Sequence, residues 1–141
     1  MMAVGKRGVD YIGVGVGAVI LNNKNEILLL LRKKAPEKDH WTIPGGAVEW
    51  FETCEQAIER ECREEVALDI KVERMLTVVN HIVETEQKHW VSVEFLVTPK
   101  NNKNPVMDQF ESEKMKWFSI DNLPSNITQP TREAVDAYLL S

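Results

Sequence analysis

The stretch GAVEWFETCEQAIERECREEVAL, residues 46–68, decides the fold because it contains a helix with a recognisable start and one apolar face. Thr53 and Gln56 have the spacing of a capping box, in which each side chain accepts a hydrogen bond from the other residue's backbone N–H. The sequence therefore predicts a helix from Thr53 to about Ala67. At about 100° per residue, its apolar residues form one stripe: Cys54, Ala57, Ile58 and Cys62.

Acidic residues of this helix stand where an amphipathic helix normally has apolar ones. Glu61 and Glu65 fall on or beside the apolar stripe, one turn apart, and Glu64 flanks them. Like charges at this spacing cost roughly a few tenths of a kcal/mol on an exposed helix, and partial burial raises the cost. A hard divalent cation would neutralise these charges, and Mg2+ takes oxygen ligands. A solvated, charged helix face is the alternative interpretation.

The residues before the helix favour the metal interpretation. Pro44, Gly45 and Gly46 precede it, and a glycine lets a bare backbone carbonyl approach a metal or a phosphate closely. Glu52 stands just before the N-cap, where its carboxylate can pair with a basic side chain or accept backbone N–H groups.

Residues 11–21 alternate as a β-strand does, with glycines on one face and apolar side chains on the other. Glycine weakens a strand, so three of them on one face indicate close approach by another backbone or by a flat ligand. A tightly packed crossing of two sheets explains them equally well. The glycines are Gly13, Gly15 and Gly17, and the apolar residues are Ile12, Val14, Val16 and Ala18.

The rest of the chain predicts further strands and a second helix. Residues 26–32 (EILLLLR) are apolar enough for a strand buried on both sides, and residues 41–49 read as short extended pieces. Because strands and helices do not alternate regularly, we predict an α/β sandwich with a mixed sheet and a single domain over residues 1–141. The other predicted elements are strands at 71–83, 89–97 and 114–120, loops at 33–40 and 99–109, and an amphipathic helix at 130–140.

The composition argues against several classes of protein. A net charge of -5, without a basic patch, argues against binding a nucleic-acid polymer. The apolar run at 11–21 is too short to span a membrane and lacks a signal-peptide cleavage site. On the predicted helix, Cys54 and Cys62 are about 12 Å apart, too far for a disulfide. We therefore expect reduced thiols and a cytoplasmic protein without a membrane partner.

The spacing of the charged residues resembles the signature of the Nudix hydrolases. That signature is a glycine, five residues, a glutamate, seven residues, and then Arg-Glu-aliphatic-x-Glu-Glu-x-Gly-aliphatic. Its six fixed glycine, arginine and glutamate positions before the helix end all match, while Ala67 replaces the second glycine and Cys62 an aliphatic residue. Phe51 stands where relatives often have glycine. The matching stretch is Gly46-x5-Glu52-x7-Arg60-Glu61-Cys62-x-Glu64-Glu65-x-Ala67-Leu68.

Other parts of the chain extend the resemblance. The glycine-bearing strand, the lead-in at 41–46 and the segment at 116–124 look like further landmarks of the family. Residues 78–80 and 89–91 look similar to its nucleoside-triphosphate diphosphatase branch, which handles oxidised and thiopurine nucleotides. The resemblance implies a Nudix-like α/β/α sandwich and a MutT-like hydrolase.

The resemblance also implies roles for individual residues. Mg2+, or Mn2+ in its place, would be held by three helix glutamates and one backbone carbonyl. A further metal ligand is expected from a later loop, with Glu111 as first choice and Glu113 as the alternative. Glu52 would fix the geometry between loop and helix. The expected metal ligands of the signature are Glu61, Glu64, Glu65 and the Gly45 carbonyl, and the expected catalytic residues are Glu61 as proton acceptor, Arg60 as orienting residue, and Glu64.

The identity of the substrate is less determined. The first choice is a nucleoside triphosphate cut to a monophosphate and pyrophosphate, including clean-up of modified nucleotides; the second is ADP-ribose or another nucleotide sugar. A catalytically silent nucleotide-binding module is the alternative from another class, and action on an RNA cap is disfavoured by the charge. A homodimer is expected by analogy alone. The expected substrate-binding residues are Arg32 at phosphate, Gly46, and the aromatic residues Phe51 and Trp90, for which core packing is the alternative role.

Overall fold

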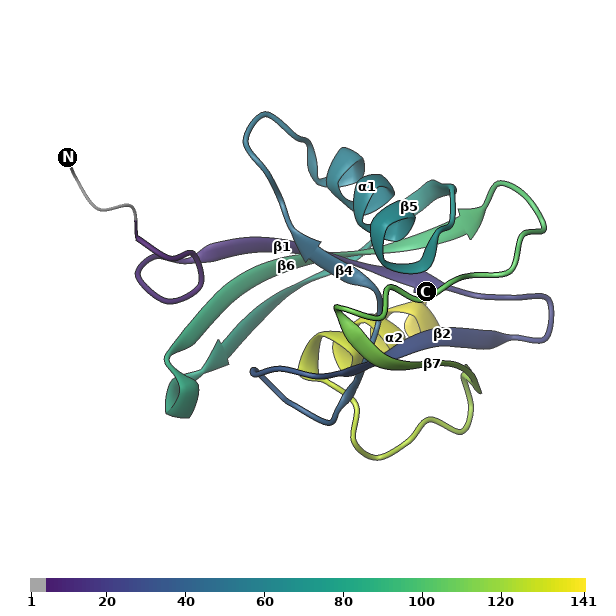
Figure 1. The fold of residues 1–141 in the computed structure, drawn as a ribbon. Coiled ribbons are helices and arrows are strands. Elements are labelled where there is room, and N and C mark those ends of the chain that lie inside the picture. Colours follow the sequence, from purple (N-terminus) through teal and green to yellow (C-terminus); the bar gives the residue numbers. More distant parts are fainter. Residues whose placement is uncertain (1–4) are drawn as a thin grey trace.

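The computed structural model describes residues 5–141, which form two β-sheets and two α-helices (Figure 1). A short 3-10 helix, η1 (Glu84–Glu86), fills the turn between the two longest strands. The strands are β1 (Gly13–Ile20), β2 (Glu26–Arg32), β3 (Trp41–Thr42), β4 (Gly45–Ala47), β5 (Ile70–Val83), β6 (Lys88–Pro99) and β7 (Ser112–Ser119), and the helices are α1 (Cys54–Val66) and α2 (Gln129–Leu140).

The predicted mixed sheet has the strand order β4-β1-β6-β5. In it β1 and β6 run parallel, while β1 and β4, and β5 and β6, are antiparallel. A second sheet, antiparallel and of order β3-β2-β7, adds to this arrangement. Local alternation identifies a strand but not its partners, so the division into two sheets lay beyond the sequence pattern.

The two helices cover opposite sides of the β-strands, which gives the predicted α/β/α sandwich (Figure 1). Strand β2 contributes to both cores: Leu28 and Leu30 pack in the cluster around α1, while Ile27 and Leu29 pack in the cluster around α2. These four side chains are at most 1% exposed, which confirms the prediction that this strand is buried on both sides. Burying one such side chain contributes roughly 1.5–3 kcal/mol.

Helix α1 begins and ends as the sequence predicts, to within one residue. Thr53 is its N-cap, and the reciprocal hydrogen bonds with Gln56 complete the capping box, at 3.0 and 2.9 Å. At the other end Ala67 takes a left-handed conformation with φ of 56°, and Leu68 N–H donates to the Cys62 carbonyl at 3.3 Å. The Ala67 N–H donates to the Arg63 carbonyl at 3.2 Å, which is the αL motif of a helix end, where glycine is the usual residue at the left-handed position.

Both cysteines are free thiols, as predicted. Cys62 lies on the buried face of α1, and burial raises the pKa of its thiol to about 12. No helix within residues 5–141 is long and apolar enough to cross a membrane.

Candidate active site

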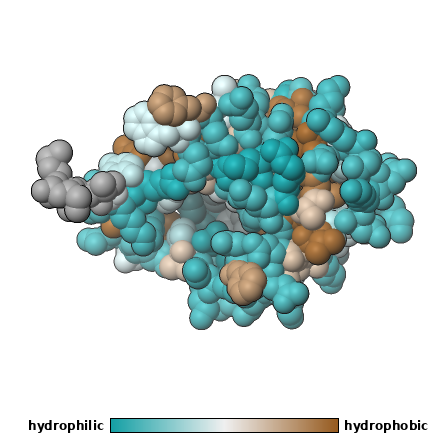
Figure 2. All heavy atoms as spheres, turned by 45° about the horizontal axis from the view of Figure 1, so that its top comes forward, coloured by the Kyte–Doolittle hydropathy of each residue, from teal (hydrophilic) through white to brown (hydrophobic). Residues whose placement is uncertain are grey.

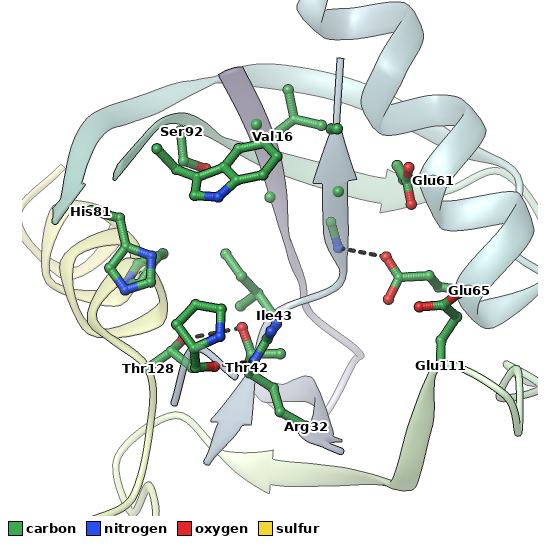
Figure 3. Close-up of a pocket in the computed structure, with 18 of the residues that line it drawn as sticks. Val16, Arg32, Thr42, Ile43, Glu61, Glu65, His81, Ser92, Glu111 and Thr128 are labelled. Carbon is green, nitrogen blue, oxygen red and sulfur yellow. Dashed lines mark hydrogen bonds between the residues drawn. The ribbon is translucent and has the colours of Figure 1, made fainter. Parts of the chain in front are cut away.

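A cavity of about 630 Å3 opens between the two sheets and the inward side of α1. Its size is typical of sites for small molecules. Figure 3 shows Glu61, Glu65 and Glu111 on one side of it and His81 and Ser92 on the opposite side. The face shown in Figure 2 is mainly hydrophilic. The residues of Figure 3 give the cavity an acidic end beside α1 and a second end, opposite it, at His81 and Ser92.

Arg60 links the loop before α1 to the acidic residues of the helix. Its Nε lies 2.7 Å from Oε2 of Glu52 and its Nη2 lies 2.9 Å from Oε1, which makes a bidentate pair. The same guanidinium donates to Glu61 at 2.8 Å, to Glu64 at 3.2 Å and to the Ala47 carbonyl at 2.9 Å. These hydrogen bonds lower the pKa of Glu52 to about 2 and raise the pKa of Arg60. Loop and helix are therefore held together by one charged group.

Glu61 and Glu65 lie side by side at the cavity. The Glu61 side chain is 13% exposed, against 58% for Glu64. The carboxyl groups of Glu61 and Glu65 are within hydrogen-bonding reach of each other. Burial raises the pKa of both, and the neighbouring charge of Glu61 raises that of Glu65 further. The helix thus concentrates negative charge, which Arg60 offsets only in part.

Two glycines of β4 make this arrangement possible. A Cβ on Gly46 would overlap the carboxyl group of Glu61. A Cβ on Gly45 would overlap the Val16 carbonyl, and the Gly45 N–H donates to Oε1 of Glu65 at 3.0 Å. The two glycines therefore let the β4 backbone lie close to β1 and to the acidic side chains of α1.

The remaining predicted metal ligands are less tightly placed. Glu64 and Glu111 line the cavity, and the charge of Glu111 contributes to the raised pKa of Glu65. Glu113 is exposed and does not line the cavity. No three Asp, Glu, His or Cys side chains of residues 5–141 converge tightly enough to hold an ion. The donor chemistry fits a hard divalent cation, since all the groups are oxygen donors, but the ligand set stays a prediction.

Basic side chains share the cavity with these carboxylates. Arg32 ends β2 at the cavity, and its Nε donates to the Pro36 carbonyl at 2.6 Å. Burial lowers the pKa of its guanidinium, although the surrounding carboxylates oppose this shift. Arg7, Lys33 and Lys88 also line the cavity. These positive side chains are suitable partners for a phosphate group, and the contact of Arg32 with phosphate stays a prediction.

The structure does not bring Phe51 to the cavity. Phe51 is 98% exposed and pairs with Trp50, which is 87% exposed, at a ring-centroid distance of 5.7 Å. The backbone of Phe51 is left-handed, with φ of 67°, which accounts for glycine at this place in relatives. The role of Phe51 in binding substrate stays a prediction, without a contact to the cavity.

The cavity wall opposite α1 explains why β1 has three glycines on one face. Trp90, Ser92 and Glu94 of β6 are the register partners of Gly13, Gly15 and Gly17. A Cβ on Gly13 would lie 2.6 Å from the Trp90 ring, and a Cβ on Gly17 would overlap the Glu94 carboxylate. The glycines therefore make room for large side chains of the neighbouring strand, and those three side chains line the cavity.

Trp90 was an expected substrate-binding residue, whereas Ser92, Glu94 and His81 were not expected. One signal could have indicated Glu94, since it interrupts an apolar run (VSVEFLV, residues 91–97) in a strand. His81 is 8% exposed, and its Nε2 lies 2.8 Å from Oε1 of Glu37. Farther along this wall, Thr128 Oγ1 donates to Thr42 Oγ1 at 3.0 Å.

Comparisons with known proteins agree with this architecture. The sequence profile of the family described as NUDIX domain matches residues 12–138. The solved structure of the MutT NUDIX hydrolase from Burkholderia pseudomallei is similar, with a TM-score of 0.80 and 37% identity over 91% of this chain and 98% of that chain.

Two curated relatives are also similar. The ADP-ribose pyrophosphatase of Methanocaldococcus jannaschii is 33% identical over 105 residues, which cover 74% of this chain and 61% of the relative. The human 8-oxo-dGDP phosphatase NUDT18 is 29% identical over 122 residues, which cover 85% of this chain and 35% of the relative. The chain thus spans less than two thirds of either relative's length. With its signature helix, its sandwich fold and the profile match over nearly its full length, the chain belongs to the Nudix family.

Proposed function

We propose that this chain hydrolyses a phosphoanhydride bond in a nucleoside diphosphate derivative, with Mg2+ or Mn2+ bound at the acidic end of the cavity. The observation that carries the proposal is the Glu61–Glu65 pair, two largely buried carboxyl groups with raised pKa values side by side in a cavity. Such charges are costly without a cation, and hard divalent ions prefer oxygen ligands. The basic side chains in the same cavity suit a phosphate group.

The ion would be held by Glu61, Glu64, Glu65 and the Gly45 carbonyl, with Glu111 as a further ligand. When bound, it supplies charge compensation for the phosphate oxygens and the leaving group. The glycine at position 46 leaves the room that the Glu61 carboxyl group occupies at the cavity.

The side chains carry the rest of the reaction. Glu61 accepts the proton of the attacking water, a role that suits a carboxylate whose pKa is raised by burial. Arg60 holds Glu61 and Glu64 in place through its hydrogen bonds. The N–H groups of Arg32 that do not bond Pro36 bind a phosphate oxygen. Positioning and electrostatics would supply most of the rate enhancement.

A nucleoside triphosphate, cut to a monophosphate and pyrophosphate, is the first candidate substrate. The basic residues that line the cavity favour a highly charged phosphate chain, and the resemblance to the triphosphate diphosphatase branch points the same way. ADP-ribose is the second candidate, because the 33% identical relative is named an ADP-ribose pyrophosphatase. A modified guanine nucleotide such as 8-oxo-dGDP belongs to the panel as well, given the named activity of the human relative.

Product analysis over a substrate panel tests the proposal. Nucleoside triphosphates, 8-oxo-dGDP and ADP-ribose are incubated with Mg2+, with Mn2+ and with a chelator, and the products are identified by chromatography. We expect a monophosphate and pyrophosphate from a triphosphate, with no turnover in the chelator. Turnover of ADP-ribose alone would replace the first candidate by the second. Binding of nucleotides without turnover of any substrate would contradict hydrolysis and favour a silent binding module.

A cytoplasmic location and a homodimer stay predictions. The free thiols are compatible with a reducing compartment. A small-molecule nucleotide is the proposed partner.

A further inference from the structure

Glu94 is a buried carboxylate that neither the signature helix nor the proposed reaction uses. It is 0% exposed, lies on β6 and lines the cavity. Its Oε1 accepts a hydrogen bond from the Ser92 hydroxyl. Its Oε2 has no hydrogen-bond partner among the described residues. A buried acceptor left in this state destabilises the fold, and more so when the group is charged.

The surrounding side chains leave this oxygen without a donor. Oε2 occupies the space above Gly17, where a Cβ would overlap it and would lie 2.7 Å from Cδ1 of Ile43. His81 is near enough for its charge to lower the pKa of Glu94, but its Nε2 lies 2.8 Å from Glu37. Because Oε2 is buried, a hydrogen bond to it would face little competition from water, and hydrogen bonds are stronger in such surroundings than in water.

The position of Glu94 relates it to a ligand in the cavity. Glu94, Ser92 and Trp90 alternate along β6, so all three side chains lie on one face of the strand. They form the wall opposite Glu61 and Glu65. In Figure 3 this wall is marked by Ser92 of β6 and by His81 of the neighbouring strand β5. A nucleotide with its phosphates beside α1 would extend its base toward this wall. Trp90 offers an aromatic surface for the base.

We propose that Glu94 is a specificity residue whose free carboxylate oxygen accepts an N–H group of the substrate's base, which selects a guanine-type edge. The inference rests on the proposed function for the placement of the phosphates. Guanine presents two adjacent donors, N1–H and the 2-amino group, which suit a carboxylate. Adenine and cytosine present one amino donor beside a ring-nitrogen acceptor, and uracil flanks its single N–H with two carbonyl oxygens. Those acceptors would face the carboxylate and repel it.

Binding of nucleoside monophosphates tests this selection without turnover. Isothermal titration calorimetry at pH 8 and without divalent metal compares GMP, IMP and AMP on the wild-type chain. We expect GMP to bind at least about tenfold more tightly than AMP, because a hydrogen bond to a charged group is worth that much. IMP, which keeps N1–H and lacks the 2-amino group, should fall between them. Equal affinities for GMP and AMP, or no binding of any of the three at millimolar concentration, would overturn the proposal.

Glu94→Gln gives the matched variant, since the amide keeps the shape and replaces one acceptor by a donor. We expect GMP to lose at least about tenfold in affinity, while AMP changes less than about twofold. Glu73→Gln is the control, because Glu73 lies on β5 in the same sheet, carries the same charge and does not line the cavity. Its affinities should equal those of the wild type. A Glu94→Gln chain that folds and keeps the full preference for GMP would overturn the assignment.

The outcome is separable from that of the proposed hydrolysis. A chain that prefers GMP but cleaves no substrate would contradict the reaction and leave the base selection standing. A chain that cleaves guanine and adenine triphosphates with equal kcat/KM would support the reaction and overturn the role of Glu94. In a guanine-selective enzyme, Glu94→Gln should raise KM for the guanine substrate and change kcat little.

Discussion

Gly17 and Glu94 are register partners in the parallel pair of β1 and β6, and the glycine leaves the space that the Glu94 carboxylate occupies. A glycine inside a strand lowers its stability. Here the missing side chain allows a charged group to fold inward over the neighbouring strand and reach the cavity. The two residues therefore form one structural unit, although they lie far apart in the sequence.

Gly17→Ala tests this unit. The added methyl group would overlap Oε2 of Glu94 and lie 2.7 Å from Ile43, and both neighbours are buried. We expect a loss of about 1–3 kcal/mol in the free energy of unfolding, as for other overpacked sites. Urea denaturation followed by circular dichroism measures it. Gly15→Ala is the comparison, because its nearest contact would be 3.3 Å, and it should cost less. Equal losses at both positions would contradict the proposed relationship.

Glu94 should make stability depend on pH in the absence of ligand. Burial raises its pKa from 4.5 in the unfolded chain to about 7, so the folded chain holds this proton more tightly. This contribution to stability is fully present below pH 4.5 and is lost as the pH rises toward and through 7. The full shift corresponds to up to about 3 kcal/mol. Glu94→Gln removes it.

The measurement is the difference in unfolding free energy between Glu94→Gln and the wild type from pH 5 to pH 8. We expect the variant to gain stability relative to the wild type across this range. Both chains retain Glu61 and Glu65, so the contribution of that pair cancels in the difference. A difference that does not change with pH would show that Glu94 titrates near its ordinary value in the folded chain.

The sequence predicts those parts of the molecule that depend on local periodicity. The caps of α1 and the double burial of β2 follow from residues close together in the chain. The far wall of the cavity could not be predicted, because Trp90, Ser92 and Glu94 meet the glycines only through the parallel pairing of β1 and β6. Local periodicity does not predict whether a single aromatic side chain is exposed. The sequence therefore could not show that Phe51 lies away from the cavity.

Arg60→Lys should weaken the junction between loop and helix. A lysine ammonium cannot reproduce the bidentate pair with Glu52 together with the bonds to Glu61 and the Ala47 carbonyl. We expect a loss of about 1–3 kcal/mol in the free energy of unfolding, since Arg60 is only partly buried. Arg63→Lys, on the exposed side of the same helix, should change stability by less than about 0.5 kcal/mol. Similar effects at the two positions would rule out a special role for Arg60.

Glu65→Gln should separate stability from activity. The amide oxygen can still accept the Gly45 N–H, while the charge facing Glu61 disappears. Because burial and Glu61 raise the pKa of Glu65, its ionisation destabilises the metal-free fold increasingly as the pH rises above 4.5. We therefore expect the metal-free variant to have a higher Tm than the wild type at pH 8.

The same variant should lose metal-dependent turnover by more than about 100-fold, and Glu61→Gln should do likewise. Calorimetric Tm values with and without Mg2+, beside kcat/KM on the best substrate, give both readouts. Glu59→Gln, on the same helix but not at the cavity, is the control and should keep activity. Full activity of Glu65→Gln would falsify the role given to the acidic pair.

Ala67→Gly should stabilise the fold. Ala67 ends α1 with a φ of 56°, a left-handed conformation that costs a residue with a Cβ roughly 1–2 kcal/mol. Glycine removes this strain but makes the unfolded chain more flexible, which lowers the free energy of unfolding by about 0.4–1 kcal/mol. We expect a net gain of about 0.5–1 kcal/mol in urea denaturation. Ala57→Gly makes the same change inside the right-handed, buried part of α1 and should destabilise by at least about 1 kcal/mol. If both variants were destabilised alike, the left-handed helix end would not be present in solution.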